Sequence, residues 1–243
     1  GTRLADIARE KAGIIKERVP VVTGVADGDA LSVISKIASD HRSRLTVVEP
    51  ASVPAEVSPE ASGLIAALGT HQRHNACVAM SAVRELTQRG WKISAAAIEQ
   101  GLRSPSNPVR IERLGENPTV IVDAAHNWIS AGALVETVQA LPADGKRVLV
   151  FGTSTDKDVR GLCRRLFPHF DAVILTRYES TQRGISLEAL AAIASAVSSN
   201  PVHLAEDPAS AWQAAQDICP EDGLICVAGS FFLAAEIRRL IRH

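Results

Sequence analysis

The sequence lacks the features that mark several classes of protein. Its 243 residues contain only four cysteines, without the CxxC spacing of a zinc or redox site. No apolar run approaches the ~20 residues of a membrane-spanning helix, and the first residues lack the charged and apolar regions of a signal peptide. We therefore expect reduced, buried cysteines and a cytoplasmic protein. The cysteines are Cys77, Cys163, Cys219 and Cys226.

An excess of one charge is missing as well. The chain has 26 basic and 27 acidic residues, and the formal net charge is -1. Because the two signs are interspersed, there is no basic stripe of the kind that nucleic acids or anionic membranes require. A small-molecule partner is expected instead. The composition, 46% hydrophobic and 22% charged, is that of a globular protein with enough apolar material for two modest cores.

The first hundred residues mix helical and strand patterns. The apolar spacing predicts a strand after each of the first two helices, and Ser94 is placed to cap the fourth helix. Residues 51–63 carry only a weak pattern. The predicted helices are 2–15, 29–39, 70–89 and 94–103, and the predicted strands are 19–24 and 44–50.

A linker follows, and the pattern then changes. The stretch "SPSNPVR" holds two prolines, two serines and an asparagine, so we place domains at residues 1–104 and 111–243 with a linker at 105–110. Beyond it, five apolar strands are each followed by a helix. Parallel neighbours need such crossovers, so this half is predicted to be a doubly wound α/β domain with a mostly parallel sheet.

Polar residues gather where these strands end. Ligands of such sheets bind beyond the carboxyl ends of the strands, where "TVIVDAAHNW" places Asp123, His126 and Asn127. Lys157 follows the second strand and Ser230 the last. Asp and Asn at these junctions also cap helices, and both interpretations stay open. His126 is harder to explain as a cap, and an Asp for ribose hydroxyls beside an imidazole for a phosphate suits a nucleotide.

Lys11 is unusual because it stands among apolar residues of the first helix, in a stripe with Leu4, Ala8 and Ile15. Its stem could pack while the ammonium reaches water or a carboxylate. Alternatively, burial could favour a neutral amine that captures carbon dioxide as a carbamate. The sequence alone leaves both possibilities open.

The stretch "HQRHN" places His71, His74 and Asn75 on one helical face. A metal site needs a third ligand that nothing nearby supplies. We therefore expect these side chains to line a polar cleft.

Several stretches together resemble one family. In order they are "IAREKAGIIKERVPVVTG", "GTHQRHNACVAMSAVREL", "NPVRIERLGENPTVIVDAAHN", "FGTSTDKDV" and "VAGSFFLAAEIR". They are similar to the second half of folylpolyglutamate synthase / dihydrofolate synthase, a branch of the Mur ligase superfamily, from residue 3 to about residue 240. The resemblance implies an incomplete P-loop-type central ATPase domain, of which residues 1–104 are the C-terminal part. A Rossmann-like C-terminal domain at 111–243 follows it.

The resemblance implies an ATP-dependent amide ligase. In that family a folate or dihydropteroate carboxylate attacks the γ-phosphate of ATP and gives an acyl phosphate. The amine of L-glutamate then displaces phosphate, while Mg²⁺ neutralises the phosphoryl charge.

The same resemblance implies roles for individual residues. Lys11 matches a lysine that becomes carbamylated and helps to hold a second Mg²⁺, and Arg110 matches an arginine that meets the ATP phosphates. Asp123 and His126 match ribose and phosphate contacts. The other residues in nucleotide-binding motifs are His71, Gln72, Asn75, Asn127, Lys157 and Ser230.

The chain departs from the family in two places. Pro108-Val109-Arg110 stands where Pro-Gly-Arg is usual, and no Gly-Lys-Ser or Gly-Lys-Thr phosphate loop occurs in the 243 residues. We therefore expect the C-terminal part of a longer, monomeric enzyme, inactive without its N-terminal part. One alternative is a peptidoglycan-precursor Mur ligase, against which "EKAGIIK" and "HQRHN" favour the folate branch. Another is a ligand-binding protein that kept this fold and lost catalysis.

Overall fold

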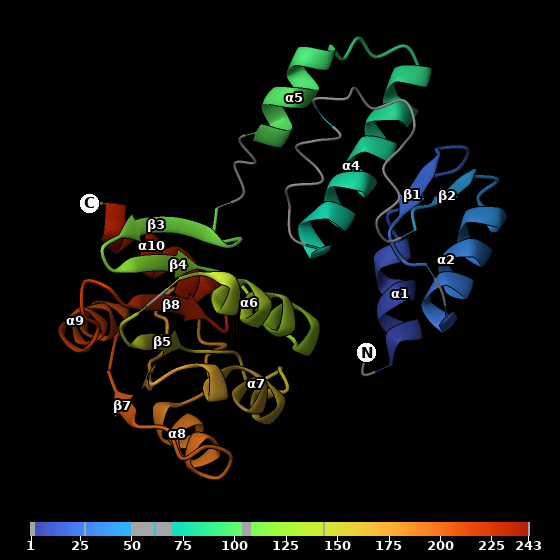
Figure 1. Ribbon diagram of the computed structural model, residues 1–243. Coiled ribbons are helices and arrows are strands. Elements are labelled where there is room, and N and C mark those ends of the chain that lie inside the picture. Colours follow the sequence, from blue (N-terminus) through green and yellow to red (C-terminus); the bar gives the residue numbers. More distant parts are fainter. Residues whose placement is uncertain are drawn as a thin grey trace. The chain divides into compact units, whose positions relative to one another are not determined.

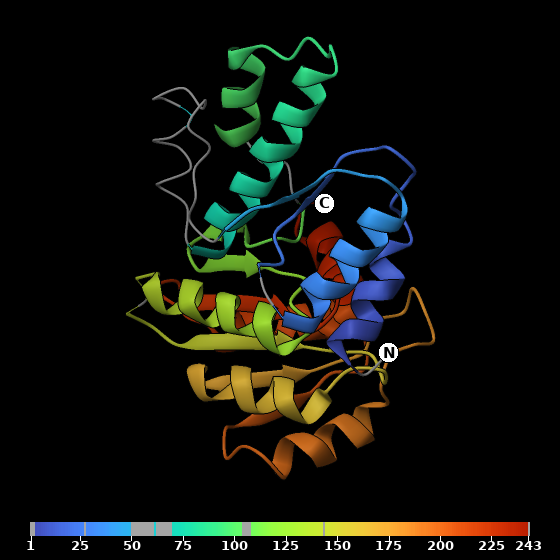
Figure 2. The ribbon, with the colours of Figure 1, turned by 90° about the vertical axis from the view of Figure 1, so that its right-hand side faces the viewer.

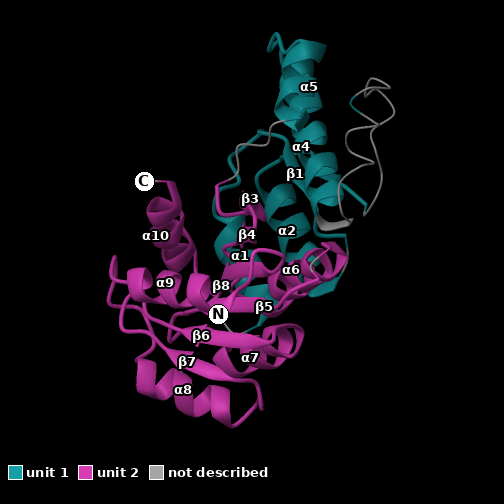
Figure 3. Cartoon of the chain, turned by 60° about the vertical axis from the view of Figure 1, so that its left-hand side comes forward, with its two compact units in different colours: residues 1–106 teal, residues 107–243 magenta. Residues whose placement is uncertain are grey.

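The computed structural model describes residues 3–26, 28–49, 61, 70–103, 108–142 and 144–242. The chain forms two compact units, residues 1–106 and residues 107–243 (Figure 3). Each unit has hydrophobic clusters of its own. The predicted linker at 105–110 lies partly outside the described residues, as does most of the weakly patterned stretch 51–63.

The first unit begins with a helix, a strand, a second helix and a second strand. The two strands pair in parallel, and the two helices pack against each other. The predicted helices and strands are therefore confirmed here, with shorter strands than expected. The elements are α1 (Leu4–Ala12), β1 (Val21–Thr23), α2 (Gly28–Asp40) and β2 (Leu45–Val47).

The predicted apolar face of α1 is wrong in part. Leu4 is 71% exposed and Ile14 81% exposed, and Ile7 is exposed as well. Small side chains are buried instead, Ala8 at 7% and Ala12 at 5% exposure. Alanines allow two helix backbones to approach closely, so the contact with α2 follows the alanine side of α1.

Two further helices complete the described part of the first unit. Helix α4 (Thr70–Gln88) ends before Gly90, whose φ of +90° favours glycine. Helix α5 (Ala95–Arg103) begins after Ser94, whose hydroxyl accepts a 3.1 Å hydrogen bond from the Ala97 N–H. Both predicted helices and the predicted cap are confirmed.

The second unit contains a six-stranded sheet in the order β3-β4-β8-β5-β6-β7, in which β3 is antiparallel and the other strands are parallel (Figure 1). The five predicted strand-helix pairs are confirmed. The strands are β3 (Glu112–Glu116), β4 (Thr119–Val122), β5 (Arg147–Phe151), β6 (Ala172–Leu175), β7 (Val202–Leu204) and β8 (Leu224–Ala228). The helices are α6 (Trp128–Ala140), α7 (Val159–Leu166), α8 (Leu187–Ser195), α9 (Pro208–Ile218) and α10 (Phe231–Arg242), with a 3-10 turn at Phe167–His169.

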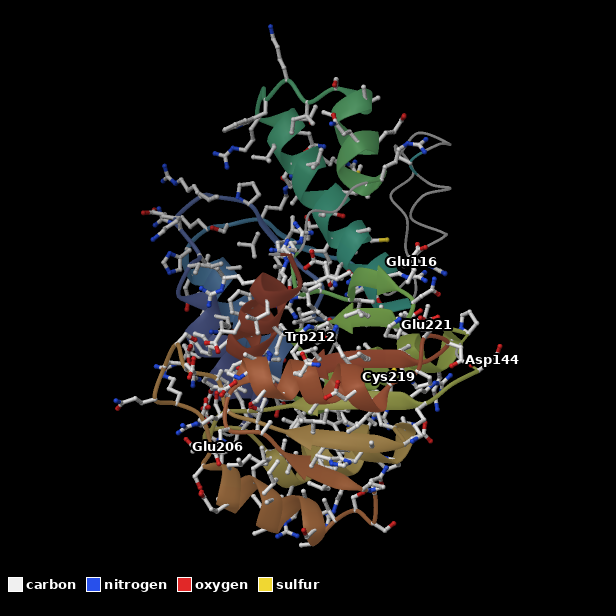
Figure 4. All side chains as sticks on the ribbon, turned by 90° about the vertical axis from the view of Figure 1, so that its left-hand side faces the viewer. Glu116, Asp144, Glu206, Trp212, Cys219 and Glu221 are labelled. Carbon is white, nitrogen blue, oxygen red and sulfur yellow. The ribbon has the colours of Figure 1, made fainter. Side chains whose placement is uncertain are left out.

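Helices cover both faces of this sheet. Successive residues of a strand point to opposite faces, and in β5 Leu149 and Phe151 join one hydrophobic cluster while Val148 and Val150 join the other. Helices α6, α7 and α8 cover the first cluster (Figure 2), and α9 and α10 cover the second (Figure 4). The predicted doubly wound, mostly parallel fold is therefore confirmed.

Strand β3 was not predicted from the sequence. It pairs with β4 through a short turn at Asn117 and Pro118. Its residues, "ERLGE", include three charges and a glycine, which conceal the alternation expected of a strand.

The four cysteines are free and buried, as expected. Burial raises the pKa of the Cys163 thiol to about 12, which keeps it protonated and unreactive. Within the described ranges, every helix is too short or too polar to cross a membrane.

Candidate functional site

Three turns meet at the carboxyl edge of the sheet in the second unit. Because β8 lies between β4 and β5, the turns that follow these three strands are neighbours. The Gly229 N–H donates to the Ala125 carbonyl at 2.8 Å, and the Gly152 N–H donates to the Ala228 carbonyl at 3.4 Å. Gly229 has a φ of +105°, and a side chain there would collide with the Gly152 carbonyl. The edge predicted to bind a ligand is thus one continuous surface of backbone and polar side chains.

Asp123 holds two segments of this edge together. Its side chain is 6% exposed, and its two oxygens each accept a 2.7 Å hydrogen bond, from the N–H groups of Ile111 and Ala125. Burial raises the pKa of this carboxyl, although these two bonds and the nearby charge of Arg110 act in the opposite direction. Asp123 therefore fixes the start of the turn and ties it to the chain beside Arg110.

His126 is oriented by the turn itself. Its Nδ1 lies 2.8 Å from the Ala124 carbonyl oxygen, and a carbonyl can only accept, so Nδ1 carries the hydrogen. The His126 N–H donates to the Ser130 hydroxyl at 3.2 Å. The half-buried ring thus keeps Nε2 for another partner, as an acceptor when neutral and as a donor when protonated.

Asn127 is a helix cap. Its Oδ1 accepts a 2.9 Å bond from the Ser130 N–H, and the Ser130 hydroxyl accepts from the Asn127 N–H, which is a capping box at the start of α6. Asp158 caps α7 in the same way by accepting from the Gly161 N–H. The capping interpretation of Asn127 is therefore confirmed.

Arg110 is exposed, between two residues with unusual backbone. Val109 has a φ of +56° and Ile111 a φ of +50°. The valine that replaces the family's glycine therefore occupies a conformation that glycine would adopt without strain.

Lys157 and Ser230 have local partners. The Lys157 ammonium lies 2.9 Å from the Asp156 carboxylate, which lowers the pKa of that carboxyl. Ser230 is 4% exposed, and its hydroxyl accepts a 3.1 Å bond from the Phe232 N–H in the first turn of α10. Thr153, just after β5, is 1% exposed, and its hydroxyl has no hydrogen-bond partner among the described residues.

Two carboxylates of the second unit were not predicted from the sequence, Glu236, which is buried, and Glu112, which is partly buried. Glu236 is 8% exposed and accepts bonds from the N–H groups of Glu179 and Ser180, 3.0 and 2.8 Å away, so it holds the turn after β6. Glu112 binds the N–H of Val109 at 2.9 Å. An acid within the apolar stretch "FFLAAEIRRL" was a signal for Glu236. Glu112 gave none, because its strand was not predicted.

Lys11, in the first unit, is exposed. Its side chain is 74% exposed, and its ammonium lies 3.0 Å from the Glu10 carboxylate, whose pKa it lowers. Of the two possibilities that the sequence left open, burial of the amine does not occur in this structure. The ammonium reaches a carboxylate, as the other possibility required, but the exposed side chain lacks the packed stem. Of the apolar residues in the same stripe, Leu4 is exposed, whereas Ala8 and Ile15 are buried.

The "HQRHN" residues do not act as one group. The His74 Nε2 lies 2.9 Å from the Gly24 carbonyl oxygen and links α4 to the end of β1, while its buried Nδ1 has no hydrogen-bond partner in the described part of the chain. Asn75 is exposed and donates to the Gln72 side chain at 3.3 Å. The side chain of His71 lies outside the described residues. Within the described part of the chain, no group of three His, Cys, Asp or Glu side chains could hold a metal ion.

The fold and this edge match one family. Residues 109–231 match the model of the Mur ligase glutamate ligase domain, and the chain belongs to the Mur ligase family. Within that family, its relatives are the folylpolyglutamate and dihydrofolate synthases. It is 27% identical to the dihydrofolate synthase/folylpolyglutamate synthase of Bacillus subtilis and 26% identical to the folylpolyglutamate synthase of Lacticaseibacillus casei.

Solved structures give the same result. The folylpolyglutamate synthase of Mycobacterium tuberculosis, complexed with ADP and AMPPCP, is 27% identical, with a TM-score of 0.82 over 100% of this chain and 60% of that chain. The sequence matches cover 100% and 99% of this chain but 59% and 58% of the Bacillus and Lacticaseibacillus enzymes. The chain thus spans less than two thirds of the length of these relatives.

Proposed function

We propose that this chain contributes the glutamate ligase domain of an ATP-dependent ligase that adds L-glutamate to folate or dihydropteroate. The observation that carries the proposal is the way Asp123 joins two candidate phosphate-binding groups. Its carboxylate binds the N–H of Ile111, next to Arg110, and the N–H of Ala125, next to His126. The family match supports a nucleotide as the ligand, as do the ADP and AMPPCP complexes of the Mycobacterium tuberculosis relative.

Each group fits a part of ATP. The exposed guanidinium of Arg110 offers a planar set of N–H donors for phosphate oxygens. His126, held through Nδ1, offers Nε2 to a phosphate oxygen. Each Asp123 oxygen has a further lone pair for a ribose hydroxyl. Asn127, Lys157 and Ser230 lie on the same edge, and we propose that they complete the nucleotide side of the site.

The chemistry proceeds in two balanced steps. A carboxylate oxygen of the folate attacks the γ-phosphorus of ATP, and ADP leaves, which gives an acyl phosphate. The glutamate nitrogen then attacks the acyl carbon, the amide C–N bond forms, and phosphate leaves with the C–O bond electrons as the amine loses a proton. Arg110 and His126 bind and orient phosphate oxygens in the first step.

The first unit supports its proposed roles less directly. Gln72 and Asn75, together with His71, are proposed on the adenine side through the resemblance of "HQRHN". Mg²⁺ is proposed for the complete enzyme, although the described residues provide no cluster of ligands for it and Lys11 is paired with Glu10. We also propose that a phosphate loop outside these 243 residues is needed for turnover.

The decisive experiment uses the longest reading frame that contains this chain. ATP- and glutamate-dependent ligation is measured with dihydropteroate, tetrahydrofolate and a UDP-muramyl precursor as acceptors. We expect product with a folate acceptor only, and none from the 243 residues alone. Product with the muramyl precursor would favour the peptidoglycan branch, and no product with any acceptor would favour a binding protein.

A variant tests the site itself. Because the His126 ring is half-buried and bonded only to its own turn, His126→Ala should lower turnover at least about 100-fold with little change in melting temperature. A large loss of melting temperature with activity retained per folded molecule would instead assign His126 to the core.

A further inference from the structure

The residues on both sides of Arg110 have a backbone conformation that their side chains disfavour. Val109 and Ile111 are β-branched, and their φ angles of +56° and +50° lie in the left-handed region. That region costs a non-glycine residue about 1–2 kcal/mol, so the conformation persists only where its surroundings fix it. Specific contacts must therefore hold this loop.

Three hydrogen bonds hold it. The Val109 N–H donates to Glu112 Oε2 at 2.9 Å, and the Val109 carbonyl accepts from the Ala124 N–H at 2.7 Å. The Ile111 N–H donates to Asp123 at 2.7 Å. The Val109 side chain is also 2% exposed. The backbone is therefore fixed on both sides of Arg110, while the guanidinium stays exposed.

Glu112 is itself fixed by the last helix. Its Oε2 accepts a 2.7 Å bond from Arg238 Nε, and its Oε1 accepts a 2.9 Å bond from Arg242 Nη2, both on α10. Burial alone would raise the pKa of Glu112, but the bonds from Arg238 and the Val109 N–H, with the charges of both arginines, lower it. The side chain, 15% exposed, thus remains a carboxylate that links α10 to the loop, 126 residues away in sequence.

We propose that Glu112 is a positioning residue that acts through Val109 to hold Arg110 in place for the phosphates of a bound nucleotide. Arg238 supports it by fixing the Glu112 carboxylate. The nucleotide as ligand rests on the proposed function. A loop that is held before binding loses less conformational entropy when the anion arrives, so Glu112 should increase affinity without touching the ligand.

A double-mutant cycle on the 243-residue chain tests this, with ADP as the probe and calorimetry as the measurement. Glu112→Gln keeps a neutral acceptor for the Val109 N–H and loses the charge that binds the arginines. We expect it to weaken ADP binding about 5- to 10-fold and Arg110→Ala to weaken it about 10- to 30-fold. The double variant should bind no more weakly than Arg110→Ala alone, because Glu112 acts only through Arg110.

Glu116→Gln is the matched control. Glu116 is an exposed acid at the other end of strand β3 (Figure 4), so the same chemical change should leave the ADP affinity unaltered. Arg238→Gln provides a second route, since it keeps Glu112 and removes one of its two arginine partners. Arg238→Gln should weaken ADP binding about 2- to 3-fold. It should have no further effect in a protein that already carries Arg110→Ala.

Each possible result either supports or contradicts the positioning role of Glu112. Additive effects of Glu112→Gln and Arg110→Ala, or an unchanged affinity in Glu112→Gln, would reduce Glu112 to a structural ion pair. Failure of the wild-type chain to bind ADP would also overturn the inference. If the longer reading frame catalyses ligation but the effects of Glu112→Gln and Arg110→Ala on ADP binding are additive, only the positioning role is contradicted. If the two effects are not additive but no ligation occurs, only the proposed function is contradicted.

Discussion

The two units differ in the partners of their charged side chains, which are mostly local and exposed in the first unit but include distant, largely buried groups in the second. In the first unit, Lys11 pairs with Glu10 and Lys36 with Asp40, over one and four residues on exposed helix surfaces. In the second, the carboxylates of Asp123, Glu112 and Glu236 bind groups 12, 126 and 57 residues away and are largely buried. Long-range bonds at buried sites fix one arrangement. The second unit therefore presents a site edge that is held by its own contacts.

The hydrophobic cores differ in the same direction. The second unit has a cluster on each face of a six-stranded sheet, with many side chains fully buried. The described part of the first unit has two small clusters and a two-stranded sheet. Bonds between distant residues occur in that unit as well, from His74 to Gly24 across 50 residues and from Arg44 to Glu85 across 41. The unit whose candidate site is held by buried hydrogen bonds is thus also the unit with the larger hydrophobic core.

Matched isoleucine variants should give the largest difference between the units. Ile174 in β6 is fully buried, so Ile174→Ala should cost about 2–5 kcal/mol of unfolding free energy, because a cavity remains. Ile34 in α2 is only partly buried, and Ile34→Ala should cost below about 2 kcal/mol. Denaturant unfolding with hydrogen exchange resolves the units separately. Equal losses would show that the small core is as tightly packed as the large one.

A pair of glutamates should separate the units by pH. The folded-state pKa of Glu112 is lowered, so its stabilising contribution is present above the unfolded value, near 4.5, and is lost as pH falls through the folded value. Glu112→Gln should therefore cost about 1–3 kcal/mol at pH 7 and progressively less below about pH 4.5. Glu10→Gln, at an exposed pair, should leave the stability curve unchanged at every pH.

The measurement is the unfolding free energy of the wild type, Glu112→Gln and Glu10→Gln at pH values from about 3 to about 7. This range brackets the ordinary pKa of a glutamate side chain. A Glu112→Gln penalty that stays constant with pH would mean that the charge of Glu112 contributes nothing beyond its packing. A pH-dependent loss in Glu10→Gln would show that local pairs on the first unit matter more than their exposure indicates.

Two asparagines provide a smaller contrast. Asn127 caps α6, so Asn127→Ala should cost about 1 kcal/mol. Asn75 is exposed inside α4 and bonds only to Gln72, so Asn75→Ala should cost nothing measurable, because alanine favours a helix. Thermal unfolding of both variants checks this. A cost at Asn75 similar to that at Asn127 would show that Asn75 has a structural role.

Sequence periodicity predicted the elements better than their contacts. The apolar runs of β4, β5, β6 and β8 are buried on both faces and were predicted correctly, as was the more exposed β7, whereas the charges of "ERLGE" concealed β3. The spacing of α1 marked one face of the helix but could not identify its neighbour, which contacts the alanines and leaves Leu4 exposed. The bond from Arg238 to Glu112 joins residues 126 positions apart and has no sequence signature.

The same contrast explains why the polar edge of the second unit was easier to predict than the motifs of the first. In a parallel sheet the topology itself brings strand ends together, so residues such as His126 and Ser230 could be placed on one edge before the structure was known. No comparable rule places Lys11, whose surroundings depend on how one helix packs.

Substitution of Lys11 should have the smallest effect of all, and it tests directly whether the first unit holds a specific chemical site as the second does. Carbamate formation requires a neutral amine, whereas the Lys11 ammonium is exposed and pairs with the Glu10 carboxylate. Lys11 should therefore behave like Lys36, which is 77% exposed and also paired. With ¹³C-labelled bicarbonate, neither lysine should give a carbamate NMR signal in the 243-residue chain, and Lys11→Met should leave stability unaltered. A carbamate signal that disappears in Lys11→Met but persists in Lys36→Met would show that the first unit also builds a specific chemical site.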